Sequence, residues 1–571
     1  MNATQLLEHF DRLAEAPDAV ARLRRFILDL AVRGQLVEQD AGAEPAECLL
    51  KQCELERAKA VAAGVVRKEK PPPILNDVPY LLPVGWVWAR LGSTGRIFNG
   101  DSVSESEKVA LSKVTDGYPF IATKDVGYGW QQLNYVNGLR VPVGASALKV
   151  LRADSVLICA EGGSAGKKTG LTDRKICFGN KLFANEPWEG ISASYLLALY
   201  QSSFFYKEFS SRMTGIIGGI SRAEFVLLPV PIPPAEEQMR IVAKVDELMA
   251  LCDQLEAAQQ ERERRRDRLA AASLQRLNQH ALDATPEAQR EHARFYLKHL
   301  LLLISRPAHI KATRRAILNL AVRGKLVEQV VDAEPASVLL KRLQADIKSY
   351  GIQNRVHPAA VSAITHGTAP YALPAGWVWA RMASLCRVVT DGDHLPPPKS
   401  DHGVAFLTIG NVSSGALSFA NSRYVSQDYF DKITPYRKPE LGDILYTVVG
   451  ASYGRPVLVE TDQPFCVQRH IAILKPAADL QLRYLHLLLK SQFVYDQATA
   501  SLTGTAQPTI PLRPLRNFLI PLPPLGMQHR IVAKVDELMA LCDQLEAQLT
   551  TTQTDSRRLL EAVLETALAP V

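Results

Sequence analysis

Two short segments carry residue types that could do chemistry: a lysine loop that could hold phosphate, and an acidic cluster that could hold a metal. The first, GGSAGKKT at 162–169, fails the spacing of a phosphate loop, because Glu161 stands where the first glycine is needed and Lys168 where a serine or threonine should follow the lysine. The second, DGDH at 391–394, runs into a proline-rich stretch and has no further ligands at metal spacing. We therefore interpret the first as a hairpin turn and the second as a loop, and predict no catalytic and no metal-ligating residues.

Other signatures of enzymes are missing from the sequence as well. DVPY at 77–80 is only loosely like the tetrapeptide with which amino-methyltransferases hold a base, and no glycine-rich loop for S-adenosylmethionine accompanies it. The sequence contains no helicase motif, no GxSxG and no HExxH. It therefore predicts a non-catalytic binding protein that binds no cofactor itself; a fused methyltransferase–nuclease with degenerate motifs is the enzymatic alternative.

The composition is that of a folded protein with several domains. The chain has 571 residues, of which 47% are hydrophobic and 22% charged, and this length exceeds what one hydrophobic core supports. The net charge of +7 permits an anionic partner such as nucleic acid without requiring one. Eight cysteines without a CxxC pair argue against zinc and against a disulfide framework. The start of the chain is polar, and the longest apolar patch, at 296–305, is too short to cross a bilayer. We expect a cytoplasmic protein with no membrane partner.

The whole chain repeats one plan with a shift of about 290 positions. The segment IVAKVDELMALCDQLEA occurs at 241–257 and again at 531–547 without one change. Four further pairs of matching segments precede these helices, at 24–39 and 314–329, at 43–52 and 333–342, at 82–92 and 373–383, and at 231–234 and 521–524. Both halves therefore consist of a helical segment, PxGWVWAR, a long insert, PxPP and a long helix.

The two inserts share a length but little sequence. Short β-rich runs such as SVLICA and GDILYTVVG are separated by Gly, Asn and Asp turns, and helical stretches follow them. Each insert has the size of one mixed α/β domain. The predicted fold is α+β and multidomain, with two mixed α/β domains in pseudo-twofold tandem, joined by two long coiled-coil helices.

The repeated helix has the spacing of a short coiled-coil seam. Ile241, Val245, Leu248, Cys252 and Leu255 follow the a and d positions of a heptad, and the second copy repeats them. The two helices could pair with each other, or each could be an amphipathic helix packed on its own domain. The run ERERRRDRLA at 261–270 alternates in sign, which favours a solvated helix face over a DNA contact.

The complete arrangement resembles the specificity (S) subunits of type I restriction–modification systems. The resemblance is carried by Pro-x-Gly-Trp at 83–86 and 374–377, by PIPPAEEQMRIVAKVDEL at 231–248 and by PLPPLGMQHRIVAKVDEL at 521–538. It covers nearly the whole chain. The second copy departs from the family's pattern at Met527, where the first has Glu237, which puts in doubt the local contact of that acid.

The resemblance implies two target recognition domains, each recognising one half of a split, asymmetric sequence in double-stranded DNA. The coiled helices would set the spacer between the halves, and two methyltransferase (M) subunits would dock on the duplicated regions. Those partners would carry S-adenosylmethionine for adenine methylation, and two restriction/motor (R) subunits would bring ATP and Mg chemistry for cutting unmodified DNA in phage defence. The domains that we predict are an N-terminal helical segment at 1–78, recognition domain 1 at 79–232, coiled-coil helix 1 at 233–281, a central helical segment at 282–369, recognition domain 2 at 370–523 and coiled-coil helix 2 at 524–571.

Given the resemblance, we expect polar side chains on loops of each insert to face DNA. Asn and Gln can pair with adenine, whereas Arg and Lys can pair with guanine or hold phosphate. In the first insert the candidates are Asn99, Lys124, Lys167, Lys168, Asn180, Lys181 and Arg222. In the second they are His394, Lys399, Arg455, Gln468, Arg469, Thr505 and Gln507.

Two alternatives to a restriction subunit stay open at this point. A specificity subunit of a methylation-only or other phage-defence complex would have the same sequence features, because the nuclease is another polypeptide. A coiled-coil adaptor whose inserts bind proteins would also carry a duplicated frame, but its binding would not fall with salt as DNA binding does.

Overall fold

The structure is a computed structural model of the chain. It describes residues 16, 18–66, 78–144, 148–215, 218–278, 291–292, 294–296, 298–299, 303–329, 334–357, 359–365, 369–394, 398, 400–504 and 507–568. The chain divides into two compact units, one formed by Met1–Glu261 with Gln553–Val571 and the other by Arg262–Thr552. Each unit is described by itself.

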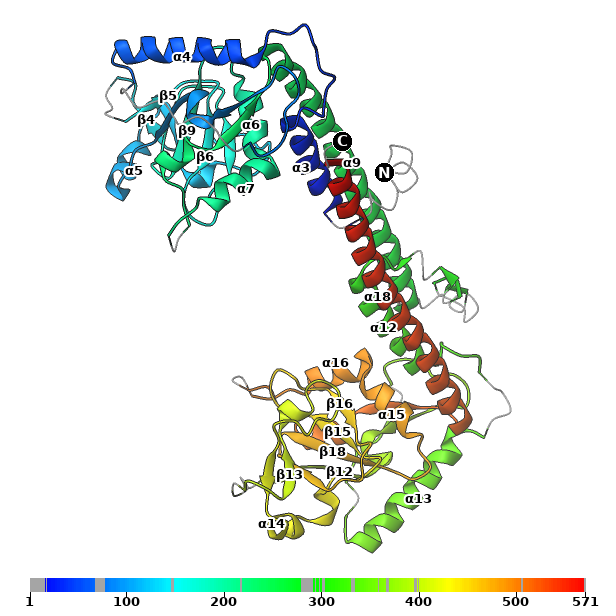
Figure 1. Cartoon of the computed structure of the whole chain (residues 1–571). Helices are drawn as coiled ribbons and strands as arrows, with labels where there is room; N and C mark the ends of the chain where they lie inside the picture. The colour runs from blue at the N-terminus through cyan, green and yellow to red at the C-terminus, as the bar shows by residue number, and fades with distance from the viewer. Residues whose placement is uncertain are drawn as a thin grey trace. The chain divides into compact units, whose positions relative to one another are not determined.

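Unit 1 contains the first mixed domain, which is built from two four-stranded sheets (Figure 1). One sheet has the order β2 (Gly95–Asn99), β9 (Leu182–Pro187), β6 (Val156–Cys159) and β7 (Thr169–Leu171), with antiparallel neighbours throughout. The other has the order β4 (Arg140–Val141), β3 (Tyr118–Ile121), β8 (Ile176–Phe178) and β5 (Val150–Leu151), in which β3 and β8 run parallel. Ile121, Leu157 and Phe178 belong to one buried cluster between them. The helices of the domain are α5 (Glu105–Leu111), α6 (Ala193–Gln201), α7 (Ser203–Ser211) and α8 (Arg222–Phe225).

Unit 2 contains the second mixed domain, on nearly the same plan. Its four-stranded sheet has the order β12 (Cys386–Asp391), β18 (Ile471–Pro476), β15 (Ile444–Thr447) and β16 (Pro456–Leu458). Its second sheet has three strands in the order β14 (Arg423–Val425), β13 (Val404–Leu407) and β17 (Phe465–Val467), in which β13 and β17 run parallel. The helices are α14 (Gln427–Lys432), α15 (Leu482–Leu489), α16 (Gln492–Ala500) and α17 (Leu512–Arg516). One difference is local: β12 shifts register against β18 between Cys386 and Val388, whereas β2 pairs evenly with β9.

A two-stranded ribbon closes each insert where the repeated motifs meet. In unit 1 β1 (Val87–Arg90) pairs antiparallel with β10 (Pro229–Ile232), and in unit 2 β11 (Val378–Arg381) pairs antiparallel with β19 (Leu519–Leu522). The tryptophans that precede the ribbons, Trp86 and Trp377, are buried. PxGWVWAR and PxPP are therefore the two ends of one joint, which explains why both recur together.

The long helices α9 (Ala235–Asn278) and α18 (Leu525–Leu568) each have 44 residues, or roughly 66 Å at 1.5 Å per residue. The seam of α9 belongs to a cluster with α3 (Ala19–Val32), and that of α18 to a cluster with α12 (Pro307–Val322). Within each unit the repeated helix thus packs on the repeated amphipathic helix of the same half. Pairing of the two long helices with each other stays a prediction. Beside the mixed domains lie α4 (Ala46–Ala62) and α13 (Ala336–Asn354), as Figure 1 shows.

The last turns of each long helix belong to the other unit. In unit 1, Leu560 and Val563 of α18 form a small apolar cluster with Ala16 and Ala19. In unit 2, the end of α9 is held by charge: Arg306 pairs with Glu263 and Asp267, at 3.0 and 3.2 Å, and His309 Nε2 lies 2.9 Å from Asp267 Oδ1. The basic run at 261–270 therefore includes acids that contact the start of α12.

The α+β fold with two mixed domains is confirmed. Of the other expectations, the six domain boundaries stay predictions, and residues 1–15 and 67–77 of the predicted N-terminal segment lie outside the described residues, as do the candidates Lys399 and Thr505. None of the helices in the described ranges has a stretch long and apolar enough to cross a bilayer. A search of the same residues finds no group of three His, Cys, Asp or Glu side chains placed to hold a metal ion.

Candidate nucleic-acid interface

A glycine–aspartate pair follows the end of β2 in the first domain and fixes the backbone there. The amide of Asp101 donates to the carbonyl of Phe178 at 3.0 Å, and the amide of Asn180 donates back to the carbonyl of Asp101 at 3.1 Å. A Cβ atom on Gly100 would lie 2.1 Å from the Phe178 oxygen, so only glycine fits. Lys149 completes the contact, because its Nζ donates to the carbonyl of Asn99 at 2.9 Å and its amide to the Asp101 carboxylate at 2.7 Å. We call this arrangement the Gly–Asp junction.

The second domain contains the same junction after β12. The amide of Asp393 donates to Val467 at 3.1 Å, and the amide of Arg469 donates to the carbonyl of Asp393 at 3.1 Å. A Cβ atom on Gly392 would lie 2.0 Å from the Val467 oxygen. Arg437 takes the role of Lys149, since its guanidinium donates to the Gly392 carbonyl at 3.1 Å. The two junctions thus share their backbone hydrogen bonds, while Lys149 clamps the carbonyl before the glycine and Arg437 clamps the carbonyl of the glycine itself.

The DGDH segment of the sequence is part of this second junction. The Asp391 carboxylate is buried; its Oδ2 lies 3.0 Å from His394 Nε2, and its Oδ1 lies 3.7 Å from the Arg437 guanidinium. The hydroxyl of Tyr429 donates to the Asp393 carboxylate. Burial and the neighbouring Asp393 charge raise the pKa of Tyr429, so the phenol stays a donor at neutral pH. The loop that the sequence predicted is therefore a braced, charged turn.

Further loops join the second junction through backbone hydrogen bonds. The amide of Val448 donates to the carbonyl of His470 at 3.1 Å, the amide of Ile510 donates to Val448 at 2.8 Å, and the amide of Gly450 donates to Pro508 at 2.9 Å. The candidates that these connected loops carry are His394, Arg455, Gln468, Arg469 and Gln507. The structure thus brings together the described candidates of the second insert on one edge.

The first domain brings most of its candidates together in the same way. The amide of Ala160 donates to the carbonyl of Lys181 at 2.9 Å, and the amide of Ile220 donates to Ala160 at 3.1 Å. The hairpin at 162–169 belongs to this edge, because the amide of Gly162 donates to Gly218 at 2.8 Å. The candidates on these connected segments are Asn99, Lys124, Lys167, Lys168, Asn180 and Lys181, whereas Arg222 lies on α8.

Three candidate cations donate to main-chain carbonyls within their own domain. Lys168 Nζ donates to Thr123 at 3.1 Å, and the guanidinium of Arg455 donates to Ser413. The Arg222 guanidinium donates to Ile97 at 3.5 Å. These side chains brace loops and strand β2. Asn99, Asn180, Lys181, Arg469 and Gln507 are exposed, as is Arg455 among the bracing cations.

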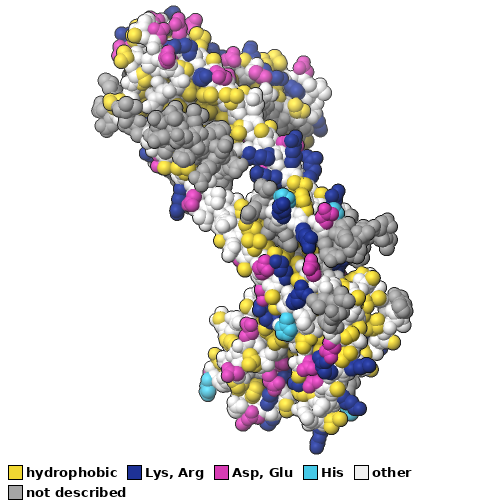
Figure 2. All heavy atoms as spheres, turned by 90° about the vertical axis from the view of Figure 1, so that its right-hand side faces the viewer, with side chains coloured by type: hydrophobic (Ala, Val, Ile, Leu, Met, Phe, Trp, Pro, Cys, Tyr) yellow, Lys and Arg dark blue, Asp and Glu magenta, His cyan; other side chains and the backbone are white. Residues whose placement is uncertain are grey.

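Exposed cations lie at both edges, among them Lys181 in the first domain and Arg469 in the second. Next to Arg469 the pKa of His470 is lowered, by burial first and by the guanidinium second, so this imidazole is neutral at pH 7. Elsewhere on unit 2, the face that Figure 2 turns to the viewer has cations and acids interspersed. Exposed lysines and arginines beside the junctions are the donors that phosphate contacts need.

Sequence reasoning missed the parts that hold the junctions. Lys149, Asp391 and Arg437 were not candidates, although each contacts a junction. A signal was present, since Gly-Asp occurs at 100–101 and again at 392–393 in inserts that otherwise share little. The clamping cations could not be found this way, because they come from loops distant in sequence.

The repeated helices carry a second matched surface. In α9 the residues Ala243, Glu247, Ala250, Gln254 and Ala257 are exposed, and their spacing of four and three places them on one helix face. Their counterparts in α18 are identical and exposed: Ala533, Glu537, Ala540, Gln544 and Ala547. We call these two sets the alanine faces.

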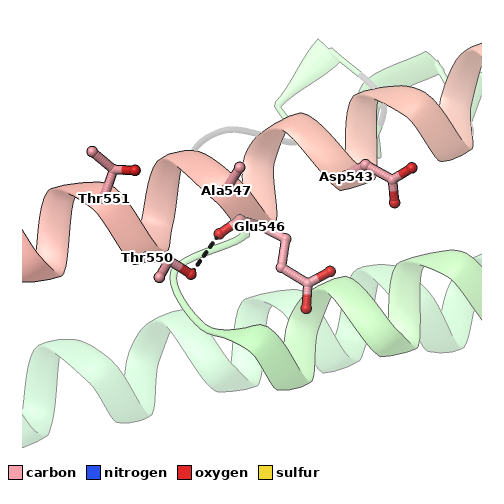
Figure 3. A pocket seen from close by; sticks show the side chains of 5 residues that line it. All are labelled: Asp543, Glu546, Ala547, Thr550 and Thr551. Atoms are coloured by element: carbon pink, nitrogen blue, oxygen red, sulfur yellow. Dashed lines mark hydrogen bonds between the residues drawn. The ribbon is translucent and has the colours of Figure 1, made fainter.

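An ion-pair cluster lies beside each alanine face. Arg24 contacts Asp253 and Glu256 at 2.6 and 2.8 Å, and Arg314 contacts Asp543 and Glu546 at 2.7 and 2.8 Å. A shallow hollow of about 470 Å³ is lined by Asp543, Glu546, Ala547, Thr550 and Thr551 (Figure 3). Its acids extend from α18 while the hydroxyl of Thr550 turns back to the Glu546 carbonyl at 2.9 Å. The hollow is thus acidic and open on one side of the helix.

Comparison with known proteins gives consistent matches over this architecture. The family model for the type I restriction modification DNA specificity domain matches residues 83–263 and 396–552. The type I restriction enzyme EcoAI specificity subunit of Escherichia coli is 28% identical over 567 residues, covering 96% of this chain and 94% of the relative. The EcoEI specificity subunit of Escherichia coli is 27% identical over 570 residues, covering 96% and 94%. A solved chain from work on complex assembly and conformational transition of the type I R-M system has a TM-score of 0.46 and 20% identity, covering 86% of this chain and 99% of its own. Because the family model covers more than half of its residues, the chain belongs to the type I restriction–modification DNA specificity family and is a specificity subunit of such a system.

Proposed function

We propose that each mixed domain recognises one half of a split, asymmetric DNA sequence and that this chain directs adenine methylation to it. The observation that carries the proposal is the contrast between the two Gly–Asp junctions, whose backbone contacts match while their exposed side chains differ. Two identical readers would recognise two equal half-sites. Two readers with the same backbone and different side chains suit an asymmetric site.

Two methyltransferase subunits dock on the alanine faces in this proposal. Packing on α3 and α12 accounts for identity at the buried positions of the repeated helix, such as Ile241 and Ile531. It does not account for identity at the exposed ones. A partner that binds twice in the same way would account for it, and small alanines allow another helix to approach closely.

The partners supply the chemistry that this chain lacks in its sequence. We infer that S-adenosylmethionine lies on the methyltransferase subunits, and that ATP and Mg act on two motor–nuclease subunits that cut unmodified DNA in the cytoplasm. The long helices set the spacer between the half-sites. Inserting one helical turn after Leu255 is then expected to lengthen the spacer, and an unchanged spacer would contradict that role.

The decisive experiment compares two hosts, one carrying this gene with its neighbouring methyltransferase gene and one carrying the methyltransferase alone. Genomic adenine methylation is mapped in both at single-base resolution. We expect a new motif of two short specified blocks around a fixed, unspecified spacer. If the methyltransferase is bound and active but no new motif arises, the proposal fails and a protein-binding adaptor takes its place.

The docking surface has its own test. Ala250→Arg and Ala540→Arg are expected to remove one methyltransferase subunit each, and the double variant both, as measured by the mass of the purified complex. Ala272→Arg is the matched control, because Ala272 is exposed on α9 outside the repeated segment. Full stoichiometry in the double variant would place the partners elsewhere.

A further inference from the structure

We propose that the Gly–Asp junctions are the base-reading positions of this protein, and that the braced cations of the same edges hold loops instead. Asn99 and Asn180 would read bases in the first domain, and Arg469 in the second, since these three side chains are exposed. The inference rests on the proposed function and sharpens it, because it separates base contacts from framework contacts.

The first step is that the junction backbone cannot move. Gly100 and Gly392 are pressed against carbonyl oxygens at distances that exclude a Cβ atom. In both domains the aspartate that follows exchanges two backbone hydrogen bonds with the facing turn. A cation from a separate loop, Lys149 or Arg437, then clamps a carbonyl of the junction. Side chains next to such a backbone have fixed origins, as base reading demands.

The second step is that the side chains beside this fixed backbone change in chemistry between the domains. The position before the glycine is an amide in Asn99 and a carboxylate in Asp391. The position in the facing turn is an amide in Asn180 and a guanidinium in Arg469. Exposed amides can pair with adenine and an exposed guanidinium with guanine, whereas the buried Asp391 carboxylate cannot reach a base. The pairs therefore differ in the base edges that they can match.

The third step concerns charge. The Asp391 carboxylate is buried and would be repelled by phosphate, so it serves neither base reading nor backbone binding. Its Oδ2 lies 3.0 Å from His394 Nε2, and its Oδ1 lies 3.7 Å from the Arg437 guanidinium. It therefore positions the side chains around the junction and leaves base contacts to the exposed Arg469.

The fourth step separates the framework cations. Lys168, Arg455 and Arg222 donate to the main-chain oxygens of Thr123, Ser413 and Ile97. A side chain so engaged ties one loop or strand to another. Its loss weakens the edge as a whole without changing which base is preferred.

The test uses the full chain with its methyltransferase in a host, with methylated adenine mapped genome-wide. For Arg469→Asn we expect one specified base pair of one half-site to relax or change, while the other half-site and the spacer stay the same. The amount of variant needed to methylate the original site should rise about 5- to 150-fold, the range for one bidentate base contact. Asn180→Arg should alter the opposite half-site only.

Two control variants separate the loss of a base contact from other effects of removing a cation. Arg483→Asn removes an exposed arginine of the same domain that pairs with Asp536 on α18, and its motif should equal that of the wild type. Lys168→Met should lower methylation evenly and keep the motif. If Arg469→Asn, with an unchanged melting temperature, methylates the wild-type motif, the inference is overturned. A wild-type chain that yields no split motif would instead overturn the proposed function.

Discussion

The segments 241–257 of α9 and 531–547 of α18 are identical, whereas the second halves of these helices differ in sequence and in the residues that hold them. The first halves pack on α3 and α12, and the matched Arg24 and Arg314 clusters repeat to within a few tenths of an ångström. The second half of α18 ends in unit 1 in an apolar cluster with one ion pair, Arg22–Glu561 at 2.6 Å, and the second half of α9 ends in unit 2 in an ionic cluster. The identical segments cannot by themselves determine which helix end binds in which unit. The dissimilar ends can, because Glu263 and Asp267 placed against Ala16 and Ala19 would lose their cationic partners.

The mixed domains also share most of their strand arrangement but differ in the charged side chains buried inside them. At matching places in the long strands, β9 carries Glu186 and β18 carries Lys475, which are buried charges of opposite sign. Glu186 pairs with Arg96 across the sheet at 2.7 Å. Lys475 pairs instead with Asp443 and Glu440, at 2.7 and 2.9 Å, while Arg387, freed by the register shift of β12, pairs with Asp346 at 2.8 Å.

Removing the buried lysine should have the largest effect on stability. Lys475→Met leaves the buried Asp443 carboxylate without its cation, and breaking such a pair costs about 3 to 5 kcal/mol. Urea denaturation followed by circular dichroism measures the loss. Adding Asp443→Asn should recover most of it, and a double variant as unstable as the single one would show that lost packing is the cause.

The same site makes stability depend on pH. Burial raises the pKa of Asp443 to about 6, more than Lys475 lowers it, from an ordinary value of 3.8. The folded state therefore binds the proton more tightly than the unfolded state. This contribution to stability is full below pH 3.8 and is lost as the pH rises toward 6. Asp443→Asn should flatten the unfolding free energy in that window.

A pair of glycines tests whether the repeated contacts of the two units contribute equally to stability. Gly34 and Gly324 have φ of +70° and +66°, and a Cβ atom would lie 2.4 Å from Pro83 Cγ in one unit and 2.6 Å from Pro374 Cγ in the other. Left-handed backbone and overpacking together should make Gly34→Ala and Gly324→Ala each cost about 2 to 4 kcal/mol. Gly526→Ala is the control, since its Cβ atom would meet nothing within 4 Å. Clearly unequal losses would break the equivalence.

The two units differ at one buried position in the first turn of their long helices. Glu237 of unit 1 is buried, and Trp86 and Gln39 lower its pKa less than burial raises it. Met527 occupies the place in unit 2, where the indole of Trp377 donates to Gln329 at 2.9 Å instead. The departure from the family's pattern at Met527 therefore comes with a hydrogen-bond acceptor for Trp377, whereas the buried Trp86 Nε1 has no hydrogen-bond partner among the described residues.

Exchanging these two residues should destabilise both units. Glu237→Met removes the buried carboxylate beside Trp86 and Gln39. Met527→Glu buries a carboxylate beside Trp377, whose indole already donates to Gln329. Each substitution should lower the free energy of unfolding by about 1 to 3 kcal/mol. Because the pKa of Glu237 is raised, its contribution is full below pH 4.5 and falls as the pH rises. The cost of Glu237→Met should therefore shrink between pH 4.5 and pH 8, as followed by urea denaturation. A cost that grows over this range would contradict the raised pKa.

The sequence could predict the elements that occur in both halves of the chain, but few of the contacts that occur in only one half. The mixed domains and the long helices followed from the repeated pattern, whereas the pairing of PxGWVWAR with PxPP in one ribbon was not predicted. The candidates near the junctions followed from the resemblance and stay predictions. Lys475 and Arg437 could not be found, because their partners lie 32 and 45 residues away and only the folded sheet brings them together. The side of α9 that contacts α12 was equally hidden, since alternating signs do not say which acids are paired.

The smallest effect should come from the ionic end of α9, and its salt dependence sharpens the comparison with the apolar end of α18. Asp267 and Arg306 are both about two-fifths exposed, so Asp267→Asn should cost less than about 1 kcal/mol and should cost nothing measurable at high salt. Leu560→Ala in unit 1 removes a buried side chain and should cost about 2 to 5 kcal/mol at any salt concentration. Urea denaturation of both variants at low and at high salt separates the two ends. Equal salt dependence of the two variants would mean that charge does not determine which helix end binds in which unit. The difference between the two ends would then need another explanation.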